Sequence, residues 1–400
     1  MRKDNFGMKV LFVGSNCPAE MYAQLQEEGA ISDFAAHTFQ NAIISGLAEN
    51  GCDIEVLTAP TILSYPRCKR LVQRSFVAVD NKNSRLFWRG VGFLNIPLIR
   101  LICKFINKSI ALCRFASKEQ VVIIYGLVSF GLLASTICAR KNRKYVIVPD
   151  LPEYMSDKRN ILYRWLKKID RSIIDYTLKY MDGYILLSQS MSDKLNIDNK
   201  PQTILEGIYQ NTSIENAGGA KQSKVLLYTG SIQTRYGLKD LFEAFVGIEG
   251  SDYKLWICGG GDMELVNRYM AMDNRIVYYG MLPRQRVLEL QREATLLVNP
   301  RHSEEEFTKY SFPSKTMEYM ASGTPTLMCK LQCLPEEYHK HLFFFDDESV
   351  AGMSRKIKEL LDMPSERMAE FGKMASEFIK ENKNANVQTR KIIDMVLLNQ

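Results

Sequence analysis

The sequence lacks the features of a membrane-spanning or secreted protein. No uncharged apolar run reaches about 18 residues, so no predicted helix is long enough to cross a bilayer. The first residues lead directly into a strand and a glycine loop, without the longer apolar core and small-residue cleavage site of a signal peptide. The nine cysteines form no CxxC pair and no Cys/His ligand spacing. We therefore expect a cytoplasmic protein whose cysteines are reduced core thiols.

Composition is that of an ordinary globular protein. With 46% hydrophobic and 24% charged residues, the 400-residue chain is long enough for two domains that each have their own core. Short apolar runs alternate with helical sequence throughout. In the first half they are 10–13, 54–57, 121–125, 145–148 and 183–187, and in the second half 225–228, 254–258, 276–279, 296–298 and 326–329.

The continuous apolarity of these runs is typical of parallel strands that are covered by helices on both faces. The sequence therefore predicts an α/β protein with two doubly wound parallel-sheet domains, residues 1–208 and 224–374. Residues 209–223 have the composition of a linker. Ligands of open parallel sheets bind beyond the carboxyl ends of the strands, so two such domains that face each other would form a central cleft.

Residues 312–325, FPSKTMEYMASGTP, predict an anion site beside a carboxylate that binds hydroxyl groups. Pro313 and Ser314 are suited to a bend and a helix N-cap, and the first amides of a helix attract phosphate. Lys315 adds a mobile positive charge there. Glu318, one turn into the helix, can accept two hydrogen bonds from vicinal hydroxyls. A nucleoside diphosphate offers both groups.

Three strands of the second domain end in glycine. Gly230, the Gly259-Gly260 pair and Gly280 each follow an apolar run and precede helical sequence. A single glycine after a strand is common turn punctuation. Three of them on one rim with the 312–325 motif favour a ligand-binding edge.

Positive charge is concentrated in the first domain. Between Arg67 and Lys118 there are twelve Lys/Arg and one acid, Asp80, which gives +11 in a chain of net charge +7. Residues 94–115 predict a basic amphipathic helix in which Arg100, Lys104 and Lys108 are four residues apart. Such a helix can lie on anionic lipid, pack on its own sheet with a solvated basic stripe, or bind nucleic acid. Because no nucleic-acid motif accompanies the charge, we expect no nucleic-acid partner.

The ordered motifs of the second domain resemble those of the retaining glycosyltransferases of family 4. These motifs are TGS…YGL from Thr229, CGGGD from Cys258, YGMLP from Tyr279, VNP from Val298 and EYMASGTP from Glu318. The resemblance implies the two-domain GT-B fold with Rossmann-like domains. It further implies a nucleotide-sugar substrate, no metal and no other cofactor, an acceptor bound by the first domain, and a final helix, 375–400, that returns to that domain.

Site residues follow from the resemblance position by position. Glu318 is similar to the family carboxylate that holds the ribose hydroxyls. Residues of the three glycine loops and of the 312–325 motif are expected to bind the donor. They are Gly230, Ser231, Gly259, Gly260, Gly280, Ser314, Lys315 and Thr316, of which the last three lie where diphosphate oxygens bind.

The chain departs from the family pattern in its charged positions. Eight residues before Glu318, where many members have a second glutamate, it has Tyr310, and Glu304, Glu305 or Glu306 is the candidate replacement. The usual arginine and lysine of the first loop are Ser231 and Tyr236. The expected substitutes for the diphosphate charge are Arg235, Lys315 and Arg301.

Catalysis of this kind requires stabilisation of a departing diphosphate, which Arg235 and Lys315 would supply. The acceptor proton can pass to the leaving phosphate, so no obvious base is needed. Asp150 follows a strand at its carboxyl end and either orients a substrate or serves as an N-cap. His37 is expected to be a surface or packing residue.

A lipid-linked glycan acceptor matches both the charge and the apolar character of residues 67–115. We therefore expect peripheral attachment to the inner face of the plasma membrane during polysaccharide assembly, through Arg100, Lys104 and Lys108. Two other functions are open. One is a catalytically silent, nucleotide-sugar-binding scaffold partner. The other is a nucleotide-sugar epimerase, which the four histidines make less favourable.

Overall fold

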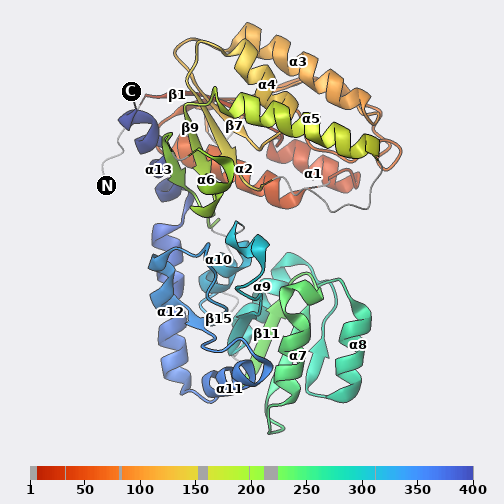
Figure 1. Ribbon diagram of the computed structural model, residues 1–400, viewed down its shortest axis with the longest axis vertical. Helices are drawn as coiled ribbons and strands as arrows, with labels where there is room; N and C mark the ends of the chain where they lie inside the picture. Colours follow the sequence, from red (N-terminus) through yellow and green to blue (C-terminus); the bar gives the residue numbers. More distant parts are fainter. Residues whose placement is uncertain are drawn as a thin grey trace. The chain divides into compact units, whose positions relative to one another are not determined.

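The computed structural model describes residues 7–31, 33–80, 83–151, 161–197, 199–210, 224–310 and 312–399 (Figure 1). The chain divides into two compact units. Unit 1 comprises Met1–Ile208 with Ala385–Gln400, and unit 2 comprises Tyr209–Asn384. Most of the expected linker, residues 211–223, lies outside the described residues. No helix in the described part of the chain is both long and apolar enough to cross a membrane.

Unit 1 is built on an eight-stranded sheet in the order β10-β9-β8-β7-β1-β2-β5-β4. Its strands are β1 (Lys9–Gly14), β2 (Asp53–Thr58), β4 (Phe76–Val79), β5 (Leu86–Gly90), β7 (Val121–Tyr125), β8 (Lys144–Val148), β9 (Gly183–Leu186) and β10 (Gln202–Ile204). Every neighbouring pair is parallel except β4 and β5. β3 (Val72–Gln73) and β6 (Phe93–Leu94) form a separate antiparallel pair. The strand order reverses at β1, whose carboxyl end is therefore the expected ligand position of this sheet.

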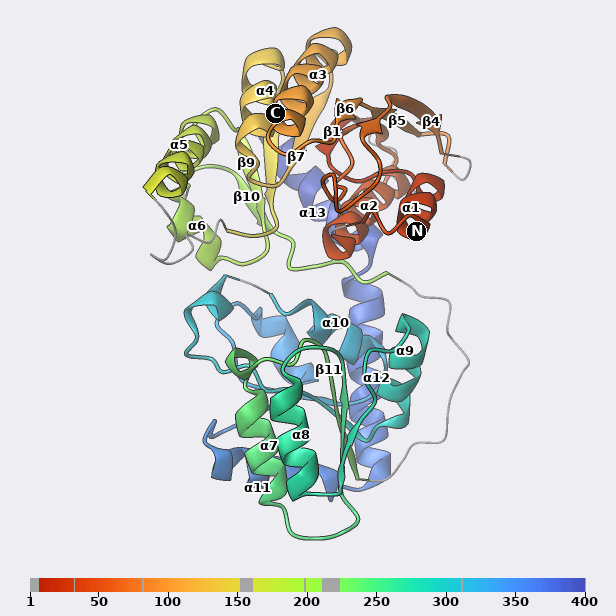
Figure 2. The same cartoon turned by 90° about the vertical axis from the view of Figure 1, so that its right-hand side faces the viewer.

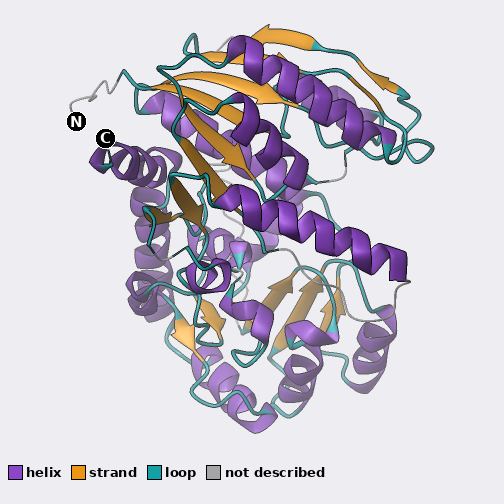
Figure 3. Ribbon diagram, turned by 45° about the horizontal axis from the view of Figure 1, so that its top comes forward, coloured by secondary structure: helices purple, strands orange, loops and turns teal. Residues whose placement is uncertain are grey.

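Two helical layers cover this sheet. α3 (Ile99–Phe115), α4 (Ser129–Cys138) and α5 (Ile161–Leu178) lie side by side in one layer (Figures 1 and 3). α2 (Phe34–Glu49) and α13 (Ala385–Leu398) pack together and share a core with β1 and β2 (Figure 2). The two short helices of the unit are α1 (Ala19–Glu27) and α6 (Ser190–Leu195).

Unit 2 contains an all-parallel six-stranded sheet in the order β13-β12-β11-β14-β15-β16. The strands are β11 (Val225–Thr229), β12 (Lys254–Cys258), β13 (Ile276–Tyr278), β14 (Leu296–Asn299), β15 (Thr326–Met328) and β16 (Phe343–Phe344). The helices are α7 (Leu238–Val246), α8 (Met263–Met272), α9 (Arg284–Glu293), α10 (Ser314–Ala321), α11 (Val350–Leu361) and α12 (Ser365–Asn382). Here the order reverses between β11 and β14.

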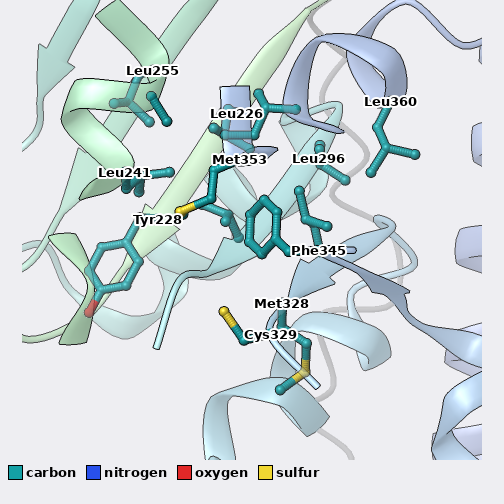
Figure 4. Packing of buried hydrophobic residues seen from close by; sticks show 14 of the residues in the cluster. Leu226, Tyr228, Leu241, Leu255, Leu296, Met328, Cys329, Phe345, Met353 and Leu360 are labelled. Carbon is teal, nitrogen blue, oxygen red and sulfur yellow. The ribbon is translucent and has the colours of Figure 1, made fainter. Parts of the chain in front are cut away.

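Alternate residues of β11 enter two cores. Leu226 and Tyr228 pack in the cluster that also contains Leu241 of α7 and Met353 of α11 (Figure 4). Val225 and Leu227 face the opposite way, into a cluster with residues of α9 and α10. The helices therefore cover both faces of the sheet, and the ligand-accessible edge is left at the strand ends. The prediction of an α/β protein with two doubly wound, Rossmann-like domains is confirmed.

The expected single helix 375–400 is wrong. α12 ends at Asn382, because the side-chain amide of Asn384 donates to the carbonyls of Lys380 and Glu381 (2.9 and 3.0 Å). Lys383 is buried, and its Nζ atom donates to Glu337 Oε1 at 2.5 Å. The return to unit 1 therefore begins at Ala385, and residues 375–384 belong to unit 2. Residues 380–384, KENKN, contain no apolar side chain, and this interruption of the apolar pattern was the available signal for the break.

Close approach of α2 and α13 depends on Gly46. A Cβ atom there would overlap the carbonyl oxygen of Ala385. We predict that Gly46→Ala lowers the free energy of unfolding by about 1–3 kcal/mol through overpacking, as measured by urea denaturation. Gly131→Ala in α4 is the matched control, because its Cβ would meet nothing closer than Val128 Cβ at 3.8 Å. A Gly46→Ala protein as stable as the control would contradict this packing.

Candidate functional site

Three glycine loops meet at the carboxyl edge of the unit 2 sheet. The amide of Gly230 donates to the carbonyl of Cys258 (2.8 Å), and the amide of Gly259 donates to the carbonyl of Gly280 (2.9 Å). The structure thus brings together the glycines that the sequence placed on separate strands. This edge includes the end of β11, where the strand order reverses.

Side chains are excluded from two of these positions. Gly259 has φ +142°, and a Cβ atom on it would overlap the carbonyl oxygen of Gly230. Gly230 has φ +150°, and a Cβ atom on it would overlap Lys315 Nζ. The ammonium group of Lys315 therefore lies in the space that a side chain at residue 230 would fill. By contrast, Gly280 has open space around its Cβ position, and Gly260 has Met281 Sδ as its nearest neighbour at 3.0 Å.

Lys315 is half-buried near the start of α10. Its Nζ atom donates to the carbonyl of Thr229 (2.9 Å) and lies 5.6 Å from the centre of the Tyr228 ring. Burial lowers the pKa of Lys315 to about 8. Glu318 raises the pKa of Lys315 and Arg301 lowers it, and both effects are smaller than that of burial. The ammonium group is held by a carbonyl and an aromatic face, which leave its charge incompletely compensated.

Two arginines extend this positive region. The guanidinium groups of Arg301 and Arg235 each lie 4.9 Å from the centre of the Tyr236 ring. Burial lowers the pKa of Arg301, and Arg235 lowers it further. Arg235 is exposed and donates to Gln233 Oε1 (2.8 Å) and the Tyr236 hydroxyl (2.9 Å). Lys315, Arg301 and Arg235 therefore form a row of mutually repelling cations, which is suited to a multiply charged anion.

His302 fixes the loop that carries Arg301. Its Nε2 atom lies 2.7 Å from Asp240 Oδ2 and its Nδ1 atom 3.3 Å from Glu348 Oε2. Glu348 also accepts a hydrogen bond from the amide of Ser303 (3.0 Å). His302, Cys329 and Glu348 place one ligand atom each within 4.8 Å of the others. Both nitrogens of His302 have carboxylate partners, so we interpret this group as a positioning network, and the expectation of no metal stays a prediction.

Glu318 is oriented by two residues of α9 that sequence reasoning missed. Glu318 Oε1 accepts from Gln291 Nε2 (2.9 Å), and Oε2 lies 3.3 Å from Arg284 NH2. Gln291 is fully buried and also lies 3.4 Å from Thr229 Oγ1. The Glu318 side chain remains 28% exposed, so it can accept further hydrogen bonds from a ligand. The seven-residue spacing of Arg284 and Gln291 on one helical face was the available signal.

Other expected donor residues differ in position. Ser314 and Ser231 are exposed, but Ser314 is the first helical residue and Pro313 is the N-cap. Thr316 is wrongly assigned to the diphosphate. Its side chain is buried with Oγ1 3.8 Å from Met328 Sδ, and its amide donates to the Pro313 carbonyl (2.8 Å). Glu306, which begins a short 3-10 helix, is exposed, as are Glu304 and Glu305.

The basic residues of α3 do not form a solvated stripe. Arg100 NH1 donates to the Ile62 carbonyl (3.2 Å), Lys104 Nζ to the Pro60 carbonyl (3.0 Å) and Lys108 Nζ to the Gly14 carbonyl (2.9 Å). The expectation that these three groups face a lipid surface is wrong, because they turn toward the strand ends of their own unit. Asp150, just beyond β8, is exposed and with Asp33 raises the pKa of the Tyr125 hydroxyl, which burial raises most.

Comparison with known proteins gives a family match for unit 2. The profile of the family "Glycosyl transferases group 1" matches residues 210–383, which is nearly all of unit 2. The chain is a glycosyltransferase of the GT-B fold. Sucrose-phosphate synthase from Thermosynechococcus elongatus has a similar structure, with a TM-score of 0.64 at 12% identity over 98% of both chains.

Two further structures show the same fold as this glycosyltransferase. A TarM variant from S. aureus, solved with UDP, has a TM-score of 0.63 at 11% identity and covers 97% of this chain and 99% of its own. HepE from Anabaena, also solved with UDP, has a TM-score of 0.62 at 11% identity and covers 98% of this chain and 100% of its own. Among curated proteins, none matches the sequence.

Lys315 is predicted to reduce the stability of the glycosyltransferase at neutral pH. Its folded-state pKa of about 8 lies below the value of 10.5 for an unperturbed lysine, so the unfolded chain binds more protons between these values. The contribution of Lys315 to the free energy of unfolding therefore rises with pH between about 8 and 10.5. We expect Lys315→Met to be more stable than the wild type at pH 7, with a smaller difference at pH 9, in urea denaturation.

Lys239→Met is the control for this measurement, because Lys239 is an exposed lysine on α7 of the same unit. Its stability difference from the wild type should stay constant between the two pH values. A constant difference for Lys315→Met as well would show that burial does not disfavour the Lys315 charge.

Proposed function

We propose that the enzyme transfers a sugar from a nucleotide-sugar donor to a lipid-linked glycan, with retention of anomeric configuration, during capsular, exopolysaccharide or lipopolysaccharide assembly. The observation that carries the donor part is the row of cations Lys315, Arg301 and Arg235 beside the oriented carboxylate of Glu318. The TarM and HepE structures solved with UDP are consistent with a nucleotide at such a site.

In this proposal the donor diphosphate lies against Lys315, Arg301 and Arg235. The ribose hydroxyls donate to Glu318, whose orientation Gln291 and Arg284 fix. The loops at Gly230 and Gly259 lack side chains, so the backbone can approach the diphosphate closely. An anion next to Lys315 and Arg301 would restore the pKa values that burial lowers, so binding offsets the free energy of holding these charges together.

The same cations would stabilise the transition state. As the bond between the anomeric carbon and the diphosphate oxygen breaks, negative charge grows on that oxygen, where Lys315 and the arginines are already oriented. The acceptor hydroxyl attacks the same face of the sugar, and its proton passes to the departing phosphate. No protein base is required. Asp150 or Glu306 would orient the acceptor or sugar hydroxyls.

A thermal-shift screen of UDP, GDP and ADP sugars tests the donor assignment. We predict that one nucleotide class stabilises the wild-type enzyme and that Glu318→Ala weakens its binding at least tenfold, because two charge-assisted hydrogen bonds are lost. Glu264→Ala is the control, because Glu264 is an exposed carboxylate of α8 whose ion pair with Arg268 is long at 3.6 Å. A Glu318→Ala enzyme with wild-type affinity would exclude the ribose role.

An activity assay with the nucleotide sugar found in this screen distinguishes the enzyme from the main alternative function. Tyr310 stands where many family 4 glycosyltransferases have a glutamate, which favours a catalytically silent, nucleotide-sugar-binding scaffold as the second candidate. Nucleotide binding without donor hydrolysis or sugar transfer to any lipid-linked acceptor would support the scaffold.

We also propose that unit 1 attaches to the cytoplasmic face of an anionic membrane. The contacts would be made by exposed apolar side chains and not by the α3 cations Arg100, Lys104 and Lys108. The outer face of the α3–α5 layer exposes the large hydrophobic residues Leu98, Ile99, Leu101, Ile102, Ile106, Ile110, Val128, Ile137, Trp165, Leu166 and Ile169. α5 also exposes Arg164, Lys167 and Lys168 around Trp165. Aromatic and aliphatic residues interspersed with cations are typical of helices at an anionic lipid interface.

Vesicle sedimentation tests this attachment. Ile102→Ser/Ile106→Ser should reduce binding to vesicles that contain phosphatidylglycerol at least tenfold, because each isoleucine contributes about 1–2 kcal/mol of apolar burial. Val77→Ser, at a similarly exposed position on β4, is the control and should bind as the wild type does. Equal binding of both variants, or no binding of the wild type at low salt, would contradict the proposal.

A further inference from the structure

A second group of cations lies at the carboxyl edge of the sheet in unit 1. The head groups of Arg100, Lys104 and Lys108 reach from successive turns of α3 to the backbone at the ends of β1 and β2. Gly14 is the last residue of β1, and Pro60 and Ile62 follow β2. Lys104 Nζ also lies 4.2 Å from the centre of the Phe93 ring. Each of the three residues is partly buried.

No carboxylate of the described residues forms an ion pair with these three groups. Burial, with smaller contributions from Lys108 and Arg100, lowers the pKa of Lys104 to about 7. Burial also lowers the pKa of Lys108 to about 8. Within the described residues, carbonyl oxygens and the Phe93 ring therefore hold three neighbouring cations.

Two buried cations elsewhere in the chain have carboxylate partners, whereas Lys144, like the α3 cations, donates to backbone carbonyls. Lys383 donates to Glu337 Oε1 at 2.5 Å, and Arg275 lies 2.6 Å from Asp273 Oδ2. A cation that is partly removed from water without a carboxylate costs free energy, and an anion that bound beside it would offset this cost. The α3 group is thus suited to an anionic ligand in a way that the Lys383 and Arg275 pairs are not.

The location of this group also favours a ligand. The sheet of unit 1 reverses its strand order at β1, and open α/β sheets bind ligands at the carboxyl ends of the strands around such a point. The loops that Lys104 and Lys108 hold contribute Ser15, Pro60 and Thr61 to a pocket. Tyr22 and His37 also line it, with ring centres 3.9 Å apart.

We propose that Arg100, Lys104 and Lys108 bind a phosphate or diphosphate group of the acceptor at this edge of unit 1. This inference rests on the proposed transfer function and names the chemistry of its acceptor side. Three fixed donors around one edge match the several oxygens of a phosphate group. The phosphate would belong either to a lipid-linked sugar or to a soluble sugar phosphate, since both present the same group.

Pyrophosphate titration by calorimetry tests the inference in full-length protein that carries Lys315→Met. This background weakens the proposed donor site, and the part of the remaining pyrophosphate binding that further substitutions in α3 remove reports on unit 1. Addition of Lys104→Met and Lys108→Met should weaken that binding at least tenfold. Addition of Arg114→Met should leave it unchanged, because Arg114 is an exposed cation on the same helix. Pyrophosphate affinity equal to that of the Lys315→Met protein in all variants would overturn the proposal.

A second arm separates the two sources of the phosphate. Vesicles of phosphatidylcholine with and without phosphatidic acid replace pyrophosphate in the same set of variants. If the Lys104→Met/Lys108→Met variant loses affinity for pyrophosphate, the phosphate group alone is recognised. If it loses affinity only for vesicles with phosphatidic acid, the site requires a lipid-bound phosphate. Absence of both effects rejects the site.

Two further results keep the outcome interpretable. Removal of buried, unpaired charge should leave the Lys104→Met/Lys108→Met protein at least as stable as its parent, which thermal denaturation checks. If the double variant is less stable, Lys104→Met alone is added to the Lys315→Met protein. Pyrophosphate should raise the Tm of the Lys315→Met protein but not that of the protein with both substitutions. An equal increase in Tm in both proteins would reject the site. Failure of the wild type to bind any nucleotide would reject the donor proposal and leave this titration unaffected.

Discussion

The ammonium group of Lys315 occupies the space that a side chain at residue 230 would otherwise fill. This contact is possible only because Gly259 packs on the Gly230 carbonyl and Gly230 itself has no Cβ atom. It brings the start of α10 against the end of β11, next to the point where the strand order reverses. Glu318, one turn along α10, is oriented by α9 at the same edge. The geometry of the candidate donor site depends on this packing.

Both units hold positive charge at the carboxyl ends of their strands, and within the described residues no carboxylate forms an ion pair with Lys315, Lys104 or Lys108. In unit 2 the cations contact aromatic rings and a carbonyl, and in unit 1 they contact three carbonyls. Burial lowers the pKa of Lys315, Lys104 and Lys108 alike. Such positions reduce the stability of the free protein, and an anionic substrate is the group that would compensate for it. A transferase with a diphosphate donor and a phosphorylated acceptor would require one such region in each unit.

Much of the fold followed from the sequence, because continuous apolar runs and glycine exits are local signals. The same signals placed Gly230, Gly259 and Lys315 at one edge. Three features were not predicted, and only the first of them had no local signal. The direction of Lys104 and Lys108 depends on tertiary packing, since the basic face of α3 turns inward and its isoleucines remain exposed. The role of Gln291 requires knowledge of which helix lies beside α10. The break after α12 arises from side-chain capping by Asn384, and the polar run 380–384 was a local signal for it.

The preference for a nucleoside diphosphate over the corresponding monophosphate tests the central claim most directly. Calorimetric affinities for both ligands, measured on the wild type and on Lys315→Met at pH 7, isolate the contribution of this ammonium group to the second phosphate. We predict that the wild type prefers the diphosphate and that Lys315→Met loses most of this preference while it retains monophosphate affinity. An equal preference in both proteins would contradict the assignment of Lys315 to the donor diphosphate.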